Sequence, residues 1–562
     1  MPAATVMVQG TASGVGKSTL VAALCRLLRR EGLRVAPFKA QNMSNNAAVT
    51  ADGGEIGRAQ AAQALAAGVA PTVDMNPILL KPEGDARSQV VVRGKVWRRL
   101  SAREYHAAKA ELLGVVAESL ARLRAAYDVV VIEGAGSPAE INLRASDIVN
   151  MAVARLADAP VLLVADIDRG GVFAALLGTL QLLEPDERAR VRGLLINRFR
   201  GDAALLAPGL RELEARAGCP VLGVVPYLPA LHLPEEDSQA LDAAPPLPAP
   251  LPPPVGEGAG VGGIDIAVLR LPRIANFDDF GPLAAEPGVR LRYVERPAAL
   301  GVPDLVVLPG SKSTLADLAW LRASGLGPAV LRLAAAGVPV LGICGGFQLL
   351  GRRLCDPDGL DGAPGEAAGL GLLAVETVFR GQKTTRPVTG RVVARGDGVF
   401  GALHGQLFSG YEIHVGRTTS ALAPFAVLAG GFTLSPNPSP TGGGRGTGRG
   451  AASHGEATDA EKSGTPQEWD QSEEQSGWSG RDGGEMPDGA VAPDGLVAGT
   501  YVHGLFHNDG LRRALLGALA ARRGLVLPAA TGPLADPFDR LADAVAASVE
   551  LRRLYALCGL PV

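Results

Sequence analysis

The sequence lacks the features that mark several large classes of protein. Its 562 residues carry a formal net charge of -3 at pH 7, so there is no basic excess to favour a nucleic-acid partner. Residues 1–9 lack the positive start and apolar run of a signal peptide, and no uninterrupted apolar stretch reaches the ~18 residues of a membrane span. We therefore expect a cytoplasmic protein with small-molecule partners, without nucleic acid or membrane among them.

Cysteine is scarce, and the number and spacing of the cysteines argue against a disulfide framework and a zinc site. The cysteines are odd in number and lack the paired spacing of a zinc site. They are Cys25, Cys219, Cys344, Cys355 and Cys558. Neither a disulfide framework nor a zinc knuckle is expected, so any cysteine with a special role would be catalytic.

A glycine-rich loop between an apolar strand and an amphipathic helix opens the chain, in the segment TVMVQGTASGVGKST at residues 5–19. Glycines let backbone N–H groups point at phosphate oxygens, a lysine adds positive charge, and a serine hydroxyl suits Mg²⁺. The predicted ATP-binding residues are Gly10, Gly14, Gly16, Lys17, Ser18 and Thr19. Five residues separate Gly10 from Gly16, one more than in the common P-loop, and this longer loop resembles that of dethiobiotin synthetase-like ATPases.

Two carboxylates are candidates to hold magnesium beside this loop. Glu133 ends the apolar run 127–132, the position from which a Walker B carboxylate reaches the metal. Asp52 comes shortly after the amide-rich segment 39–46, which follows a predicted strand at 34–38. Because open α/β sheets bind ligands at the carboxyl ends of their strands, we expect this segment, Asp52 and Glu133 at one edge.

Strands alternate with helices through the first part of the chain, which predicts a parallel, doubly wound sheet with right-handed crossovers. After the strand of the P-loop, the predicted strands are 34–38, 127–132, 161–165, 194–196 and 220–225. Asn197 follows one of them, where an amide suits adenine and an ordinary strand-end turn fits equally well. A proline- and glycine-rich linker at 243–263 ends this first domain, which we place at residues 1–242.

A nucleophile elbow dominates the second part of the chain. The segment VPVLGICGGFQLL at 338–350 combines a buried strand, a cysteine and two glycines, so a tight turn would expose the sulfur of Cys344. The Gly345 N–H would face an oxyanion, and the amides of Gly310 and Ser311, at a neighbouring strand end, would complete the oxyanion hole. This pattern is typical of a glutaminase.

A thiol nucleophile needs a base, and the histidines differ in their contexts. His503 ends a predicted strand in the segment 498–507 and is our candidate for the base. His414, in the segment 410–416, is the rival, although Glu412 and His414 better suit a role in lining the glutamine pocket.

The rest of the second domain carries less information. Residues from about 434 to 488 are polar, rich in glycine and almost without periodicity, so we expect a disordered insertion. The tail from Leu511 onward reads as helical and structural. The second domain is therefore predicted to span 264–562.

Taken together, these motifs resemble the cobyric acid synthase family of glutamine-dependent amidotransferases over nearly the whole chain apart from the insertion. The matching segments are 10–19, 39–46, 133–138, 342–348, 410–416 and 499–506. The resemblance implies an α/β protein of two doubly wound, mostly parallel-sheet domains, a P-loop ATPase followed by a flavodoxin-like glutaminase.

The resemblance also implies an activity, that of a glutamine-hydrolysing carbon–nitrogen ligase. ATP, Mg²⁺ and L-glutamine would serve to amidate the b, d, e and g carboxylates of adenosylcobyrinic acid a,c-diamide, without a tightly bound organic cofactor. Cys344 would be the nucleophile and His503 its base. Many class I glutaminases carry a glutamate two residues after this histidine, but Leu505 stands here, so the site reads as a dyad.

Two alternatives are weighed against this function. The related a,c-diamide synthases share both domain types, but the segments 41–46 and 410–416 favour the cobyric acid family. A P-loop switch protein of the partitioning type would leave Cys344 without a purpose.

Overall fold

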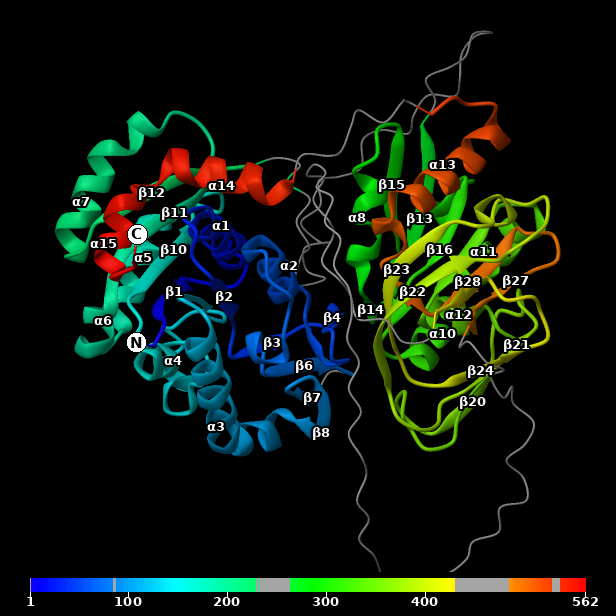
Figure 1. Cartoon of the computed structure of the whole chain (residues 1–562), viewed down its shortest axis with the longest axis horizontal. Helices are drawn as coiled ribbons and strands as arrows, with labels where there is room; N and C mark the ends of the chain where they lie inside the picture. The colour runs from blue at the N-terminus through cyan, green and yellow to red at the C-terminus, as the bar shows by residue number, and fades with distance from the viewer. Residues whose placement is uncertain are drawn as a thin grey trace, which may run out of the picture.

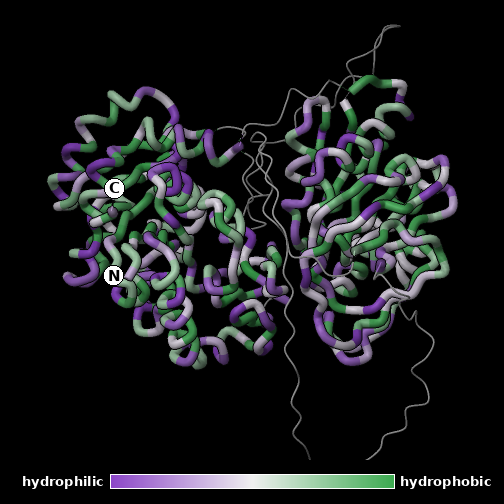
Figure 2. The backbone as a smooth tube through the Cα atoms, viewed as in Figure 1, coloured by the Kyte–Doolittle hydropathy of each residue, from purple (hydrophilic) through white to green (hydrophobic). Residues whose placement is uncertain are grey.

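The computed structural model describes residues 2–83, 87–228, 231, 263–429, 485–527 and 536–561. These residues form two α/β bodies that lie side by side (Figure 1). Hydrophobic residues follow the strands inside each body, and hydrophilic residues gather on outer turns and helix faces (Figure 2). The predicted linker and the predicted insertion fall outside the described residues, except for residues 263 and 485–488.

The first domain is built on a six-stranded parallel sheet of order β12-β11-β10-β1-β9-β2. The strands are β1 (Ala4–Gly10), β2 (Val35–Phe38), β9 (Val129–Glu133), β10 (Val161–Asp166), β11 (Val191–Phe199) and β12 (Val221–Pro226). They read as continuous apolar runs because helices cover both faces of the sheet. The predicted doubly wound parallel sheet is confirmed.

Helices pack on both faces of this sheet. They are α1 (Lys17–Arg30), α2 (Arg58–Ala67), α3 (Ala102–Ala126), α4 (Met151–Ala157), α5 (Val172–Leu182), α6 (Pro185–Arg190) and α7 (Ala207–Ala217). The longest, α3, begins at a capping box in which the Ser101 hydroxyl accepts from the Glu104 N–H and the Glu104 carboxylate accepts from the Ser101 N–H. The α1 helix buries Leu20, Leu24 and Leu28 against the sheet.

A small second sheet of the first domain lies toward the other domain (Figure 1). Its order is β3-β6-β7-β8, and a separate hairpin, β4-β5, lies next to it. The strands are β3 (Gln41–Met43), β4 (Ala47–Val49), β5 (Glu55–Gly57), β6 (Ile78–Pro82), β7 (Arg87–Val92) and β8 (Lys95–Ser101). The amide-rich segment 39–46 thus leads away from the P-loop sheet toward the second domain.

The second domain has its own central sheet, of order β15-β13-β16-β18-β28-β27, in which only β27 is antiparallel to its neighbour. Its strands are β13 (Ile264–Leu269), β15 (Val289–Val294), β16 (Leu305–Leu308), β18 (Val340–Ile343), β27 (Ala490–Val491) and β28 (Val497–Thr500). Its helices are α8 (Gly281–Ala284), α9 (Pro297–Leu300), α10 (Thr314–Ala323), α11 (Leu326–Ala335), α12 (Gly345–Leu350) and α13 (Asp509–Arg523).

Further sheets, partly or wholly antiparallel, complete this domain. One has the order β26-β25-β22-β23-β29, another β20-β19-β21-β24, and β14 pairs with β17. Their strands are β14 (Ile274–Ala275), β17 (Gly310–Ser311), β19 (Arg353–Asp356), β20 (Gly365–Ala368), β21 (Val375–Val378), β22 (Thr384–Val392), β23 (Leu407–His414), β24 (Arg417–Ser420), β25 (Ala426–Leu428), β26 (Met486–Asp488) and β29 (Val502–His503).

The last two helices, α14 (Pro537–Ser548) and α15 (Leu551–Cys558), return to the first domain (Figure 1). Leu541 and Leu554 are fully buried in the same apolar cluster as the α1 side chains. The Glu550 N–H donates to the Leu222 carbonyl at 2.8 Å, which extends the edge of the first sheet. The predicted second domain of 264–562 is therefore wrong at its end, because an apolar helix stripe does not indicate which surface it covers.

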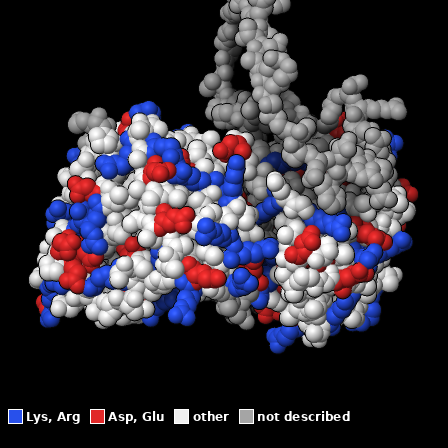
Figure 3. All heavy atoms as spheres, turned by 90° about the horizontal axis from the view of Figure 1, so that it is seen from below, with Lys and Arg blue, Asp and Glu red and all other residues white. Residues whose placement is uncertain are grey.

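No helix in the described ranges is both long enough and apolar enough to span a bilayer. On the face shown in Figure 3, positive and negative side chains are interspersed, in line with the small net charge.

Candidate active sites

Cys344 sits at the strained turn between β18 and α12. Its backbone has φ 53° and ψ -110°, a positive φ that a residue with a side chain rarely adopts. The turn is closed by the two glycines that follow, because a Cβ on Gly346 would lie 1.9 Å from the Leu308 carbonyl oxygen. The strand, turn and helix of the predicted nucleophile elbow are all present.

His503, at the end of β29, contacts both the thiol and a carboxylate. The Cys344 side chain is one of the groups that raise the pKa of His503, and the Nδ1 of His503 lies 2.7 Å from Oδ2 of Asp279. The other oxygen of Asp279 accepts from the Gly504 N–H at 2.9 Å. The site is therefore arranged as a triad of thiol, imidazole and carboxylate, in place of the predicted dyad.

Asp279 is the residue that sequence reasoning missed. It lies in the 3-10 helix η5 (Phe277–Phe280) and is 1% exposed, 224 residues before His503. The position where a glutamate was sought, Leu505, is buried in the apolar core. The one local signal was a pair of adjacent acids between two phenylalanines, since buried carboxylates usually have a partner.

The surroundings of His503 hold a proton on its ring. Burial alone would lower the pKa of His503, but the charge of Asp279, its hydrogen bond and the contact with Cys344 together raise the pKa to about 10. The protonated ring can therefore act as a general acid beside Cys344 and give its proton to a leaving group.

Backbone groups pack closely beside the Cys344 turn. A Cβ on Gly345 would come within 2.7 Å of the Ser311 amide nitrogen, and one on Gly310 within 3.1 Å of the His503 ring. These close approaches bring together all the predicted oxyanion-hole residues. Their role in binding an oxyanion stays a prediction.

His414 lies near Cys344 without replacing His503. Its ring stacks on Tyr501 at 3.8 Å between centroids, and its Nε2 is 3.7 Å from a Glu412 oxygen. The thiol approaches the backbone next to it, with the Cys344 Sγ 3.5 Å from the Ile413 carbonyl oxygen. Within the described chain the Nδ1 of His414 is buried without a hydrogen-bond partner, as a group that binds substrate would be.

In the first domain, the P-loop and Glu133 meet at the carboxyl end of the sheet. The Ser18 hydroxyl donates to Oε1 of Glu133 at 2.8 Å, and Lys39 Nζ donates to the same oxygen at 2.9 Å. Gln63, on α2, donates to Oε2 at 2.5 Å. The Lys17 ammonium is buried and donates to the carbonyl of Gly136 at 3.0 Å.

Glu133 is held in its charged form. Burial would raise its pKa, but the Lys39 charge and the hydrogen bonds from Lys39, Gln63 and Ser18 lower it. A serine hydroxyl and an ionised carboxylate in contact are oxygen donors of the kind that Mg²⁺ prefers, and this pair fits that ion. Among the described residues no group of three or more His, Cys, Asp or Glu side chains could hold a metal ion by itself, so phosphates and water would supply the remaining ligands.

Asn197 and Asp52 were predicted to bind ATP and magnesium, and the structure places each of them among other residues of the chain. Asn197 donates through Nδ2 to the Val15 carbonyl at 2.9 Å and so holds the P-loop, while its role toward adenine stays a sequence prediction. Asp52 is exposed in the turn between β4 and β5 and bonds to Thr50. The structure does not bring Asp52 to Ser18 and Glu133, so its assignment to the metal stays a sequence prediction.

Comparison with known proteins finds a family model for each domain. The chain matches the model of a CobQ/CobB/MinD/ParA nucleotide binding domain over residues 6–240 and that of a CobB/CobQ-like glutamine amidotransferase domain over residues 265–431. Fold and sites together define a glutamine-dependent ligase that uses a nucleotide.

Similar full-length proteins show which family of glutamine-dependent ligases this chain belongs to. The cobyric acid synthase of Sorangium cellulosum is 54% identical, over 100% of this chain and 99% of that protein. That of Pelotomaculum thermopropionicum is 50% identical, over 100% and 97% of the two chains. The chain belongs to the cobyric acid synthase family.

Proposed function

We propose that this enzyme amidates the b, d, e and g carboxylates of adenosylcobyrinic acid a,c-diamide in cobalamin biosynthesis, with ATP, Mg²⁺ and L-glutamine. The observation that carries the proposal is the pairing, in one chain, of the Cys344–His503–Asp279 triad with a P-loop whose Ser18 contacts Glu133. The full-length similarity to cobyric acid synthases supports this choice of acceptor.

The second domain would release ammonia from glutamine. Cys344 attacks the side-chain amide carbon as a thiolate, His503 gives its proton to the departing nitrogen, and a thioester forms. His503 then takes a proton from the water that hydrolyses the thioester to glutamate. Asp279 keeps the His503 ring in one tautomer and orientation throughout.

The first domain would activate the acceptor. A carboxylate is a poor electrophile, so transfer of the ATP γ-phosphoryl group to the corrinoid side chain gives an acyl phosphate that ammonia attacks, with phosphate leaving. Lys17 offsets charge that develops on the phosphates, and Ser18 with Glu133 would hold Mg²⁺, which neutralises phosphate charge when bound.

The contact between the domains suits the transfer of ammonia. Ala47, Leu79 and Val91 of the first domain form one apolar cluster with Tyr411 and Ile413 of the second. The Ile413 carbonyl is the group that the Cys344 thiol approaches, so this cluster lies beside the place where ammonia is released. An apolar surround excludes water, which would protonate ammonia and remove its nucleophilicity.

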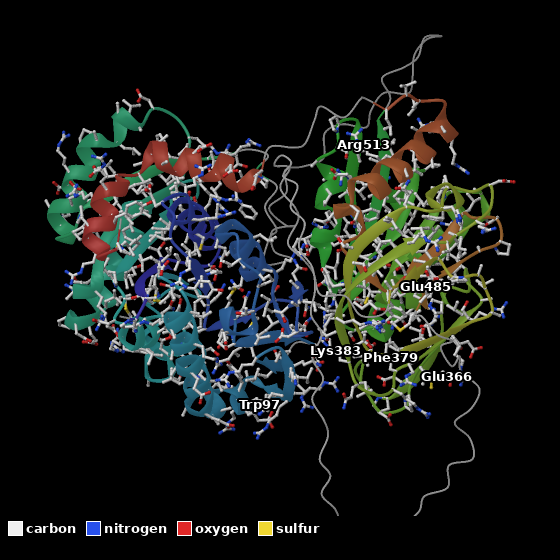
Figure 4. All side chains as sticks on the ribbon, viewed as in Figure 1. Trp97, Glu366, Phe379, Lys383, Glu485 and Arg513 are labelled. Carbon is white, nitrogen blue, oxygen red and sulfur yellow. The ribbon has the colours of Figure 1, made fainter. Side chains whose placement is uncertain are left out.

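Polar contacts hold this interface in register. The Asn276 side chain accepts from the Ala47 N–H at 3.2 Å, and Asn46 accepts from the Phe277 N–H at 3.3 Å. Lys383, on the side of the second domain that faces the first (Figure 4), lies 2.5 Å from a Glu55 oxygen. Asn46 belongs to the amide-rich segment of the sequence, which therefore helps to hold the domains together.

The test measures amide formation by the native chain and by Cys344→Ala. Each protein receives adenosylcobyrinic acid a,c-diamide, Mg·ATP and either glutamine or ammonium. The variant should make no amide from glutamine and all four amides from ammonium. Cys355→Ala, which changes a cysteine outside both sites, should behave as the native chain. A native enzyme that hydrolyses glutamine but leaves this substrate unchanged would refute the acceptor; amidation of the a and c carboxylates instead would indicate a diamide synthase.

A further inference from the structure

Helix α2 contacts the nucleotide site through Gln63 and the second domain through Arg58. Gln63, in its second turn, donates to Glu133 at 2.5 Å and to the Ser18 carbonyl at 3.3 Å. Arg58, its first residue, forms an ion pair of 2.6 Å with Asp278 of the second domain. Five residues of helix span about 7.5 Å, so one short rigid segment joins the nucleotide site to the glutaminase domain.

The ion pair between Arg58 and Asp278 is next to the catalytic triad in the chain. Asp278 precedes Asp279 in the chain, and its side chain is 5% exposed. Neither carboxylate oxygen of Asp278 makes a hydrogen bond among the residues that the structure describes. The positive charge of Arg58 is therefore the nearby group that balances the buried negative charge of Asp278. Without Arg58, two adjacent buried carboxylates would repel each other beside His503.

A second contact leads from Arg58 to the triad. The Arg58 guanidinium lies 5.9 Å from the centre of the Tyr411 ring. The same ring stacks on His503, with centroids 5.4 Å apart and an interplanar angle of 18°. Arg58 thus acts on the catalytic imidazole through both Asp278 and Tyr411, without touching it.

We propose that Arg58 is a positioning residue of glutamine hydrolysis, and that α2 transmits to it the state of Glu133 in the nucleotide site. Gln63 holds one Glu133 oxygen, and Ser18 and Lys39 hold the other, so any ligand that draws this carboxylate away acts on α2. A shift of the helix then moves Arg58 against Asp278. Ammonia release is in this way tied to nucleotide binding. The inference rests on the proposed glutaminase function.

The first test measures glutamine hydrolysis and the rate at which a glutamine-analogue chloroketone alkylates Cys344 in the nucleotide-free enzyme. Arg58→Met should lower kcat and the alkylation rate roughly 10- to 100-fold with little change in KM, and Arg58→Lys should restore part of both. Ammonium-driven amidation should stay near the native rate.

The matched control is Arg99→Met. Arg99 also crosses the interface, where it donates to the carbonyls of Gly359 and Leu360, but it does not contact Asp278. It should leave kcat and alkylation unchanged. A native kcat for glutamine hydrolysis in Arg58→Met would overturn the positioning role. An equal loss of kcat in Arg99→Met, together with a loss of ammonium-driven amidation, would also overturn it. A native chain that neither hydrolyses glutamine nor alkylates at Cys344 would instead refute the proposed function.

The second test addresses transmission along α2. The ratio of glutaminase rates with and without Mg·ATP should differ from one in the native enzyme and approach one in Gln63→Leu. Gln60→Leu is the control, because Gln60 lies on the same helix and bonds to Asn42, not to Glu133. A native ratio of one, or a native-like ratio in Gln63→Leu, would overturn the link.

Discussion

His503 works through a partner that lies far from it in the chain. The Asp279 carboxylate fixes the orientation of the ring and stabilises the positive charge of the protonated imidazole. Both residues are about 2% exposed at their side chains, so the interaction is hardly screened by solvent. The catalytic power of the glutaminase therefore depends on two segments brought together only by folding.

Asp279→Asn tests this dependence. An asparagine keeps the size of the side chain but removes its charge and favours the wrong tautomer, so kcat for glutamine hydrolysis should fall by about 10⁴-fold. Steady-state kinetics of ammonia release measures this fall. Amidation driven by ammonium serves as the control and should stay near native; a variant that keeps more than a tenth of native kcat with glutamine would contradict the triad.

The raised pKa of His503 makes stability depend on pH. Its pKa is about 10 in the folded chain and 6.5 as the ordinary value. The stabilisation from protonated His503 is complete below pH 6.5 and is lost as the pH rises through about 10, because the unfolded chain releases its proton first. The difference in unfolding free energy between native and His503→Gln should therefore shrink over this range. A constant or growing difference would contradict the assigned ion pair.

Gly16 offers a test of the nucleotide site. It has φ 96°, and a Cβ there would lie 2.1 Å from the Asn197 amide, so Gly16→Ala must distort the P-loop. Amidation should be lost with glutamine and with ammonium, while glutamine hydrolysis without ATP continues. Gly32→Ala is the matched control, since Gly32 also has a positive φ, 84°, but nothing lies within 4 Å of its added Cβ. It should cost only about 1–2 kcal/mol of stability and leave turnover unchanged.

At the scale of elements, strands that are local apolar runs could be predicted from the sequence. Contacts between residues far apart in the chain could not. The strands that end at Glu133 and near Cys344 are local apolar runs, and each run directly precedes its functional residue. The role of Asp279 depends instead on a contact across 224 residues, which leaves no periodicity in the sequence. The sheet of β3, β6, β7 and β8 was also missed, because β3 has only three residues and β8, with the sequence KVWRRLS, carries no apolar run.

The packing of the C-terminal helices α14 and α15 on the first domain is another long-range contact that the sequence did not indicate. Leu541 of α14 is fully buried against the first domain, so Leu541→Ala should destabilise that domain by about 2–5 kcal/mol. Denaturant unfolding that resolves the two domains should move only the transition of the ATPase domain. Val526→Ala is the control, because Val526 is 85% exposed, and it should change stability by less than about 0.5 kcal/mol. A shift confined to the glutaminase transition would contradict this placement.

At the scale of the whole molecule, the chain passes from the first domain to the second and returns to the first for its last two helices. Each domain therefore closes on residues far apart in sequence, and contacts of Arg58, Asn46 and Lys383 join the two domains. Glutamine hydrolysis and acceptor activation are thus properties of one assembled molecule, which explains why both motifs occur in a single chain.

The assembled molecule also predicts which part of the chain can be removed. Residues 430–484 lie outside the described residues, but the strands on either side of them pair antiparallel, Leu428 of β25 with Met486 of β26. Such a pair can be joined by two residues, and Asn-Gly has the backbone twist that this connection needs. Replacing 430–484 by Asn-Gly should therefore preserve the five-stranded sheet that carries His503 on β29.

The shortened chain should hydrolyse glutamine and amidate the corrinoid with kcat within about twofold of native, and should unfold no more readily, because a shorter connection costs less closure entropy. Thermal unfolding and both assays on the same preparation measure this. If glutaminase activity falls while the fold is kept, some group in 430–484 serves the Cys344 site; if ammonium-driven amidation also falls, that group serves the acceptor. Either loss would contradict the view that every residue needed for turnover lies in the paired strands and helices of the two domains.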